Sequence, residues 1–164
     1  EVDLGGSGGS SYFYVITIID NKLELLPLPR MKEEKTYYGG GYQIGFDVSM
    51  NFIDNYKAEI VCTETNFKEV IPIDVDIYWG EETIKDAFYD DNGKLRREIH
   101  YDDVADHAGG VTEVSNDKYD YININQSIYI DDKWGYIGSL STTLSWDKDM
   151  NLKIIKQEAI SSKQ

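Results

Sequence analysis

Cysteine is almost absent from this chain of 164 residues. The single one, Cys62, excludes an internal disulfide framework and leaves the cellular compartment open. Long apolar runs are also missing, because Val15-Ile16 is followed by Thr17, whereas a membrane helix needs about 20 apolar residues. Motifs for a nucleophilic serine, a zinc protease or a dinucleotide-binding turn are lacking as well. We therefore expect a non-catalytic protein without a membrane span.

Basic residues are few compared with acidic ones. The chain has 16 Lys and Arg against 30 Asp and Glu, which gives a formal net charge of −14. Such a surface repels nucleic-acid phosphates and anionic membranes, and it attracts basic protein surfaces or divalent cations. The charge is unevenly placed, since residues 74–132 hold 16 acidic and 5 basic side chains, or −11 of the total.

The first ten residues differ in composition from the rest. Two Gly-Gly-Ser repeats follow Leu4, and such repeats are typical of engineered flexible linkers. We interpret residues 1–10 as an artificial tag and linker, and residues 11–164 as a single β domain that is long enough to bury a core. The native compartment is open: a cytoplasmic protein and an exported one whose signal or anchor was removed both fit.

Alternation of apolar and polar residues dominates residues 42–79. Six apolar side chains occupy the even positions of Tyr42–Phe52, and the turn at Asp54-Asn55 leads into an alternating run that ends at Cys62. Because successive side chains of a strand point to opposite faces, each run predicts a half-buried strand with Cys62 facing the core. A third strand is expected over Ile71–Trp79, where Pro72 indicates an edge or a strand beginning.

The two ends of the chain show the same alternation. Tyr12–Ile19 and Leu23–Leu28 predict a hairpin around Asp20-Asn21. Strands are also expected over Tyr119–Ile130, around Tyr136–Trp146 and over Leu152–Lys156. In the Tyr136–Trp146 strand, Tyr136, Leu140, Leu144 and Trp146 are predicted to share one side. The fold class predicted is all-β, an antiparallel β-sandwich of about seven to nine strands, with a closed β-barrel as the alternative.

Residues 80–118 are the irregular part. Residues 81–89 predict either one short helix or, our preferred interpretation, a hairpin that joins Ala87–Tyr89 to Leu95–Tyr101 through Asp91-Asn92-Gly93. Asp102–Lys118 has little apolar content, so we expect a long loop there, and long loops in small domains are often functional.

Metal ligands gather in one part of this loop. His100 and His107, the two histidines of the chain, flank three aspartates, and imidazole with carboxylate suits zinc. The spacing matches no established metal motif, so a solvated acidic loop is the competing interpretation. Asp90–Gly93 and Asp147–Asn151 carry oxygen ligands suited to calcium, but both are better explained as hairpin turns. No cofactor is expected, with Ca or Zn as the exceptions to test.

Three functional hypotheses remain. In the first, the chain is an acidic inhibitor or immunity-type protein that binds a basic partner protein, with Asp102, Asp103 and Asp106 as contacts and Tyr101 as an anchor. In the second, it is an exported or cell-surface module, such as an adhesin or a carbohydrate-binding module, that uses exposed tyrosines and the Gly-rich segment Tyr37–Tyr42. In the third, it is a metal-binding protein or an enzyme centred on His100 and His107.

Overall fold

The structure is a computed structural model that describes residues 2–3, 11–12, 14–30, 44–79, 81–96, 106–118, 121–130 and 135–163. For residues 2–3, 11–12, 78–79, 106–118 and 130 it describes the backbone alone.

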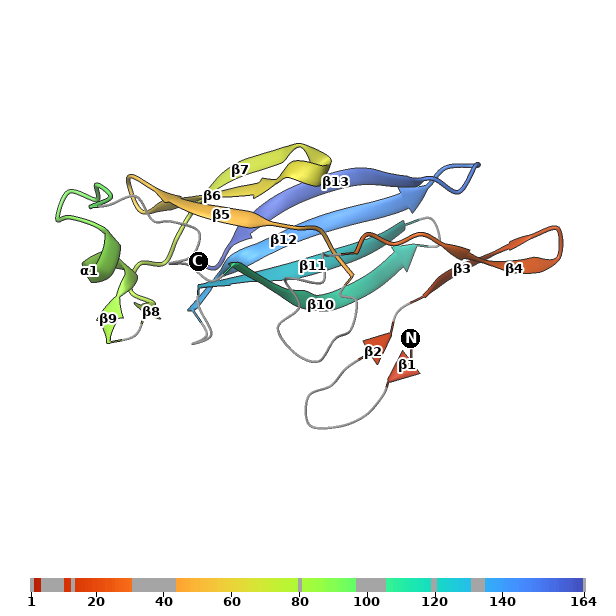
Figure 1. Cartoon of the computed structure of the whole chain (residues 1–164), viewed down its shortest axis with the longest axis horizontal. Helices are drawn as coiled ribbons and strands as arrows, with labels where there is room; N and C mark the ends of the chain where they lie inside the picture. Colours follow the sequence, from red (N-terminus) through yellow and green to blue (C-terminus); the bar gives the residue numbers. More distant parts are fainter. Residues whose placement is uncertain are drawn as a thin grey trace.

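Two antiparallel sheets face each other across one core (Figure 1). The smaller sheet has the order β5-β6-β7, formed by Ser49–Ile53, Lys57–Cys62 and Phe67–Pro72. The larger has the order β10-β11-β12-β13, formed by Asp106–Lys118, Tyr121–Ile130, Gly135–Trp146 and Leu152–Ser161. A short 3-10 turn at Thr63–Thr65 joins β6 to β7. Among the described strands both sheets have open edges, so the structure confirms the sandwich and not the closed β-barrel.

Shorter elements extend the sandwich at its ends. The hairpin β3–β4, Val15–Ile19 and Lys22–Leu26, projects at one end and brings the strands of five or more residues in the described part of the chain from seven to nine. At the other end lie β8 (Tyr78–Trp79), β9 (Glu82–Thr83) and the helix α1 (Ile84–Phe88), as Figure 1 shows. A two-residue ladder, β1 (Val2–Asp3) with β2 (Ser11–Tyr12), brackets the Gly-Gly-Ser repeats.

The core lies between the sheets and draws on both. Ile60 and Ile71 of the smaller sheet pack in one cluster with Ile124, Leu140 and Leu144 of the larger sheet. Cys62 is fully buried and belongs to the same cluster, as its place in the alternation predicts. Within the described residues, no helix has the length and apolar character that crossing a bilayer requires.

One side of the sandwich is closed by contacts between strands of different sheets. The backbone N–H of Ala159 in β13 donates to the Glu69 carboxylate of β7 at 2.8 Å. The Ser161 hydroxyl donates to the carbonyl of Pro72 at 2.6 Å. Pro72 is the last residue of β7, an edge strand of its sheet, which agrees with the edge position predicted for it.

The sequence patterns place most strands correctly and misplace some boundaries. The predicted hairpin at Asp20-Asn21 is confirmed, and both turn residues have positive φ, as a two-residue turn of this kind requires. Of the strand expected over Tyr42–Phe52, residues 42 and 43 lie outside the described residues. From residue 44 on, the strand begins at Ser49, and Phe46 and Val48 are buried as predicted. The strand expected over Ile71–Trp79 ends at Pro72, because the backbone carbonyls of Val75 and Ile77 accept hydrogen bonds from the start of α1 instead.

Two predictions for residues 80–118 are wrong. Asp102–Lys118 is not a loop throughout, because residues 106–118 form β10 and pair with β11. An edge strand needs few apolar residues, which explains why composition did not reveal it. The short helix considered for residues 81–89 is present as α1, so the preferred hairpin is wrong over Ala87 and Phe88. Its turn is present, because Tyr89 forms a bridge with Leu95 across it, and residues 97–101 of its second strand lie outside the described residues.

A bulge in β12 reverses the predicted orientation of one side chain. Ile128 pairs with Gly138 and Tyr129 with Tyr136, so Ile137 is the extra residue. Ile137 is consequently buried in the core while Tyr136 is exposed, although Tyr136 was predicted to share a side with Leu140. Because alternation assumes that every residue changes face, it cannot indicate an extra residue such as Ile137.

Candidate functional site

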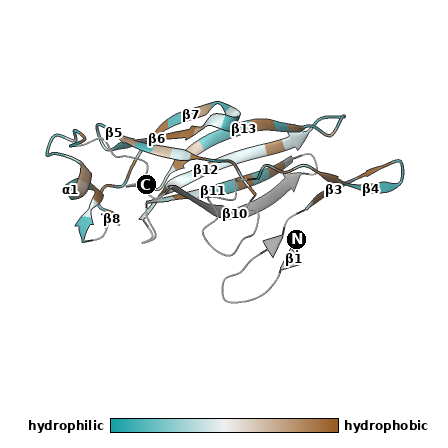
Figure 2. Ribbon diagram, in the orientation of Figure 1, coloured by the Kyte–Doolittle hydropathy of each residue, from teal (hydrophilic) through white to brown (hydrophobic). Residues whose placement is uncertain are grey.

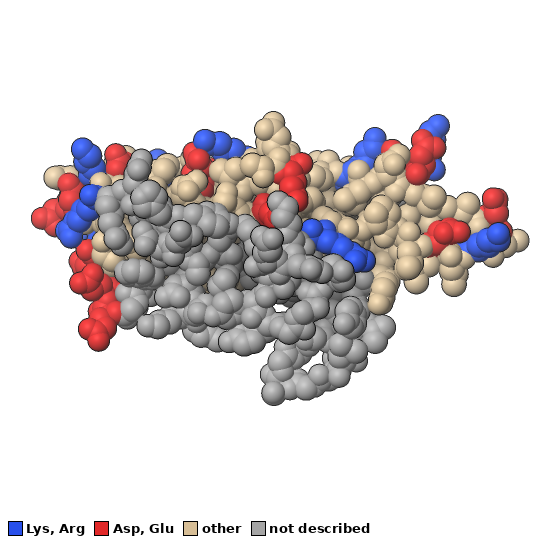
Figure 3. Space-filling view, viewed as in Figure 1, with Lys and Arg blue, Asp and Glu red and all other residues tan. Residues whose placement is uncertain are grey.

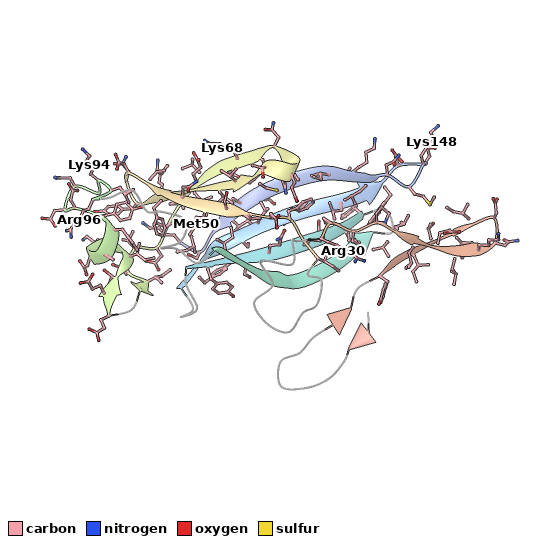
Figure 4. All side chains as sticks on the ribbon, in the orientation of Figure 1. Arg30, Met50, Lys68, Lys94, Arg96 and Lys148 are labelled. Carbon is pink, nitrogen blue, oxygen red and sulfur yellow. The ribbon has the colours of Figure 1, made fainter. Side chains whose placement is uncertain are left out.

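The end of the molecule that contains α1 carries a group of exposed carboxylates. We define the acidic end by the five exposed side chains Asp76, Glu81, Glu82, Asp86 and Asp91, which come from the β7–β8 connection, β9, α1 and the turn after it. On the face shown in Figure 3, acidic side chains gather here. Figure 4 labels the cations Lys94 and Arg96 at the same end.

Local hydrogen bonds explain why this segment forms a helix. Thr83 is the N-cap: its hydroxyl accepts from the N–H of Asp86 at 3.2 Å and donates to the Asp86 carboxylate at 2.8 Å. This reciprocal arrangement satisfies a free N–H in the first turn, and an acidic residue there is favoured by the helix dipole. Glu81 and Glu82, which precede the cap, are both exposed.

Tyr89 anchors the acidic end to the sandwich. Its ring is buried and packs against Tyr56, with centroids 5.0 Å apart, and against Phe52 at 6.4 Å. Its hydroxyl donates to the backbone carbonyls of Ile53 and Lys57, which flank the β5–β6 turn. Burial raises the pKa of Tyr89, and the charge of Asp54 adds to the rise. Tyr89 is therefore an uncharged, buried side chain that attaches the acidic end to the β5–β6 turn.

Within the part of the chain that the structure describes, none of the five carboxylates of the acidic end forms an ion pair within 4.0 Å. Three ion pairs within 4.0 Å occur among the described residues, and they join Lys68 to Glu59, Lys153 to Asp147 and Lys156 to Glu158. All three lie outside the acidic end. Exposed carboxylates without a cation in contact keep their full charge available to a partner that approaches from solvent.

The two aspartate turns that resemble calcium loops use their carboxylates within the turn. The Asp90 carboxylate accepts from the N–H of Lys94 at 2.9 Å and of Asn92 at 2.8 Å. Asp147 accepts in the same way from Asn151 and Asp149, both at 2.9 Å. These bonds to backbone N–H groups lower the pKa of both carboxyls. The prediction that both are hairpin turns is confirmed.

The candidate metal ligands fall largely outside the described residues. His100 lies outside them, and for His107 the structure describes the backbone, which pairs with Tyr129 in β11. In the part of the chain whose side chains are described, no group of three or more His, Cys, Asp or Glu is placed to hold a metal ion. The metal site at His100 and His107 remains a prediction.

The predicted partner contacts are placed only in part. Tyr101, Asp102 and Asp103 lie outside the described residues, as does the Gly-rich segment at residues 37–42. Asp106 is the first residue of β10, and its backbone pairs with Ile130 at the end of β11. Figure 1 places this start of β10 at the same end of the molecule as α1.

An aromatic pair at this end was missed by sequence reasoning. The rings of Tyr129 and Tyr136 lie 5.5 Å apart, and Tyr136 is 38% exposed. Tyr129 of β11 pairs with His107 of β10 on one side and with Tyr136 of β12 on the other. Only the bulge at Ile137 brings Tyr136 to the outside, so the alternation did not reveal the pair.

The polar face of β11 and β12 is only partly open to solvent. Ser127 and Ser139 are buried, and Asn123, Asn125, Ser141 and Thr143 are half-buried. The Thr143 hydroxyl donates to the Asn123 side chain at 2.7 Å, so part of this face is bonded to itself.

A family model matches most of the chain. The model is described as the YybI C-terminal domain, and it covers residues 46–160. The chain belongs to the YybI C-terminal domain family. The match runs from just before β5 to the penultimate residue of β13, so the YybI C-terminal domain comprises both sheets and the acidic end, while β3–β4 lies outside the matched residues. No curated protein and no solved structure matches the chain.

Proposed function

We propose that this chain is a non-catalytic protein-binding domain, of the inhibitor or immunity type, whose acidic end engages a basic surface on a partner protein. The observation that carries the proposal is the set of five exposed carboxylates around α1, outside the three close ion pairs of the described residues. Charges arranged in this way raise the rate of encounter with an oppositely charged protein and fix its orientation.

The rigid support of the acidic end favours recognition over a purely solubilising role. The Thr83 cap and the Tyr89 anchor fix the segment that carries the carboxylates. A preorganised surface loses less conformational entropy when it binds. The proposed contacts are the acidic end together with Asp102, Asp103 and Asp106, with Tyr101 as an anchor, since residues 97–105 connect Arg96 at the α1 end to the start of β10.

Salt dependence tests the proposal. The domain is immobilised and tested against folded proteins with pI above about 9, with acidic proteins as the control. The Debye length falls from about 10 Å at 0.1 M salt to about 3 Å at 1 M, so we expect at least about tenfold weaker binding at the higher concentration. Binding that is unchanged by salt, or equal for basic and acidic proteins, would contradict an electrostatic partner surface.

A second candidate is a cell-surface module that binds carbohydrate through aromatic side chains. The pair of the exposed Tyr136 with the half-buried Tyr129 favours it, because sugars stack on tyrosine rings. This candidate gives binding that varies little with salt and is lost in Tyr136→Ala. The acidic-end proposal gives the opposite result for both measurements, so one set of experiments separates the two.

A further inference from the structure

The hairpin β3–β4 presents an apolar face to solvent at the end opposite α1. Its members are the side chains of Tyr14, Ile16, Ile18, Leu23 and Leu25, which are between 52% and 73% exposed. Ile16 pairs with Leu25 and Ile18 with Leu23, so these four side chains share one face of the two-stranded ladder. Figure 2 shows the apolar colouring of both strands. We call this group the hairpin face.

The hairpin is held firmly at its base. Trp146 donates from its indole N–H to the carbonyl of Pro27 at 2.9 Å, and the N–H of Gly45 donates to the carbonyl of Pro29 at 3.1 Å. Val15 and Leu28 pack against the core. A two-stranded hairpin is only marginally stable by itself in water, so a projecting one with an apolar face gains stability when that face is covered.

More apolar surface continues next to this base. Trp146 ends β12 and pairs with Leu152, so the β12–β13 turn lies beside the hairpin. Met150, Ile154 and Ile155 near this turn are 37%, 40% and 64% exposed. At roughly 100 Å² of apolar surface for each fully exposed side chain, the eight residues present on the order of 400 Å². A standard interface buries about 800 Å² per partner, a little over half of it apolar, so this end matches one partner's share.

The charge at this end fits a second copy of the same chain. Residues 14–30 carry two acidic side chains, Asp20 and Glu24, and two basic ones, Lys22 and Arg30. Residues 147–156 carry two acidic and three basic side chains, among them Lys148, labelled in Figure 4. Two copies of a protein of charge −14 repel each other at the acidic end, whereas this nearly neutral end with mixed signs meets its own copy without repulsion.

We propose that the hairpin face docks on the same face of a second copy, so that the chain forms a two-fold symmetric dimer with both acidic ends pointing outwards. A two-fold interface uses one self-complementary patch on both partners. The pairs Ile16–Leu25 and Ile18–Leu23 supply apolar contacts, whereas Lys22 and Glu24 alternate with Leu23 and Leu25 and lie on the opposite face of the hairpin. This interface is independent of the proposed function, because it lies at the other end of the molecule.

Sedimentation velocity over a range of protein concentrations tests the proposal. The wild type is expected to move from monomer to dimer as its concentration rises, with little change between 0.1 M and 1 M salt because the contact is apolar. Ile18→Thr with Leu23→Thr keeps a β-branched residue in each strand and removes the central pair. We expect it to weaken dimerisation at least about tenfold, whereas Val70→Thr, which replaces a 45% exposed residue of β7, leaves the dimer unchanged.

Hydrogen exchange supplies a readout that needs no variant. Amides of residues 14–26 are expected to exchange more slowly as protein concentration rises, while those of residues 81–96 do not change. A wild type that stays monomeric at every concentration overturns the proposal. The proposal is also overturned if the variant Ile18→Thr with Leu23→Thr dimerises as strongly as the wild type. It is overturned as well if the wild type stays monomeric and its hairpin binds neutral lipid vesicles.

Discussion

Gln126 occupies an inward position of β11, between Ile124 and Ile128, and is fully buried. Its side-chain oxygen accepts from the N–H of Phe46 and its amide donates to the Phe46 carbonyl, both at 3.0 Å. The Gln126 side chain thus makes the two hydrogen bonds to the Phe46 backbone that a neighbouring strand would otherwise make, just before β5 begins. Gly45 permits this approach, because a Cβ there would lie 2.5 Å from the Gln126 amide nitrogen and the φ of Gly45 is +144°.

Replacing Gln126 by leucine is expected to lower the free energy of unfolding by about 2–5 kcal/mol. The substitution leaves the buried N–H and carbonyl of Phe46 without this partner, and each such group costs about 1–3 kcal/mol. Urea denaturation measures the change. Gln157→Leu is the matched control, because Gln157 is half-buried and donates at 3.1 Å to Thr142, so its loss is expected to cost about 1 kcal/mol. Equal effects of the two substitutions would show that the bonds to Phe46 stabilise the fold no more than the bond from Gln157 to Thr142 does.

At the scale of elements, the local patterns predict hairpins well and long-range partners poorly. The turns at Asp20-Asn21 and Asp147–Asn151 follow from residue types whose side chains favour turn conformations. The edge strand β10 and the bulge at Ile137 depend on what β11 offers as a partner, which no short window of sequence contains. The bond of Gln126 to Phe46 spans 80 residues and is hidden for the same reason.

The candidate site likewise combines features that local sequence predicts with features that depend on long-range packing. The acidic character of residues 74–132 is visible in the sequence, and exposed carboxylates do occupy part of it in the structure. The Thr83 cap lies one residue after Glu82, so the helix begins later than the predicted range of residues 81–89. The anchoring by Tyr89 and the exposure of Tyr136 arise only from packing and a register shift, so the sequence contains no signal for them.

The aspartate turns predict how stability depends on pH. The pKa values of Asp90 and Asp147 are lowered from 3.8 in the folded state, chiefly by the N–H groups of Lys94 and Asn151. A lowered folded pKa means that the stabilisation is complete above the unfolded value, near pH 4, and is lost as pH falls through the folded value. The double variant Asp90→Asn, Asp147→Asn should therefore be less stable than the wild type at pH 7.

Thermal melts at pH 7 and at successively lower pH values measure this difference. The gap between the wild type and the double variant is expected to shrink as the pH falls below about 4, because the wild-type carboxyls are then protonated as well. Asp91→Asn with Asp149→Asn changes neighbouring exposed carboxylates and serves as the control for net charge. A gap that stays constant down to the lowest pH would contradict the turn account.

At the scale of the whole molecule, the long axis joins two chemically different ends. One end carries α1, the exposed carboxylates and the Tyr129–Tyr136 pair, and the other carries the nearly neutral apolar hairpin. Figure 1 shows the two sheets running between them. The matched family residues, 46–160, contain the acidic end and leave out the hairpin. We therefore propose that the position of the charge, and not only its total, makes the acidic end a partner surface.

The most direct measurement compares two variants of equal net charge in binding to a basic partner protein. One neutralises the acidic end by Asp76→Asn, Glu81→Gln and Asp91→Asn, and the other neutralises the hairpin end by Asp20→Asn, Glu24→Gln and Asp149→Asn. All six side chains are exposed, so both variants should fold. We expect at least about tenfold weaker binding for the first variant and less than about twofold for the second. Equal losses would mean that total charge alone attracts the partner, and would contradict a specific role for the acidic end.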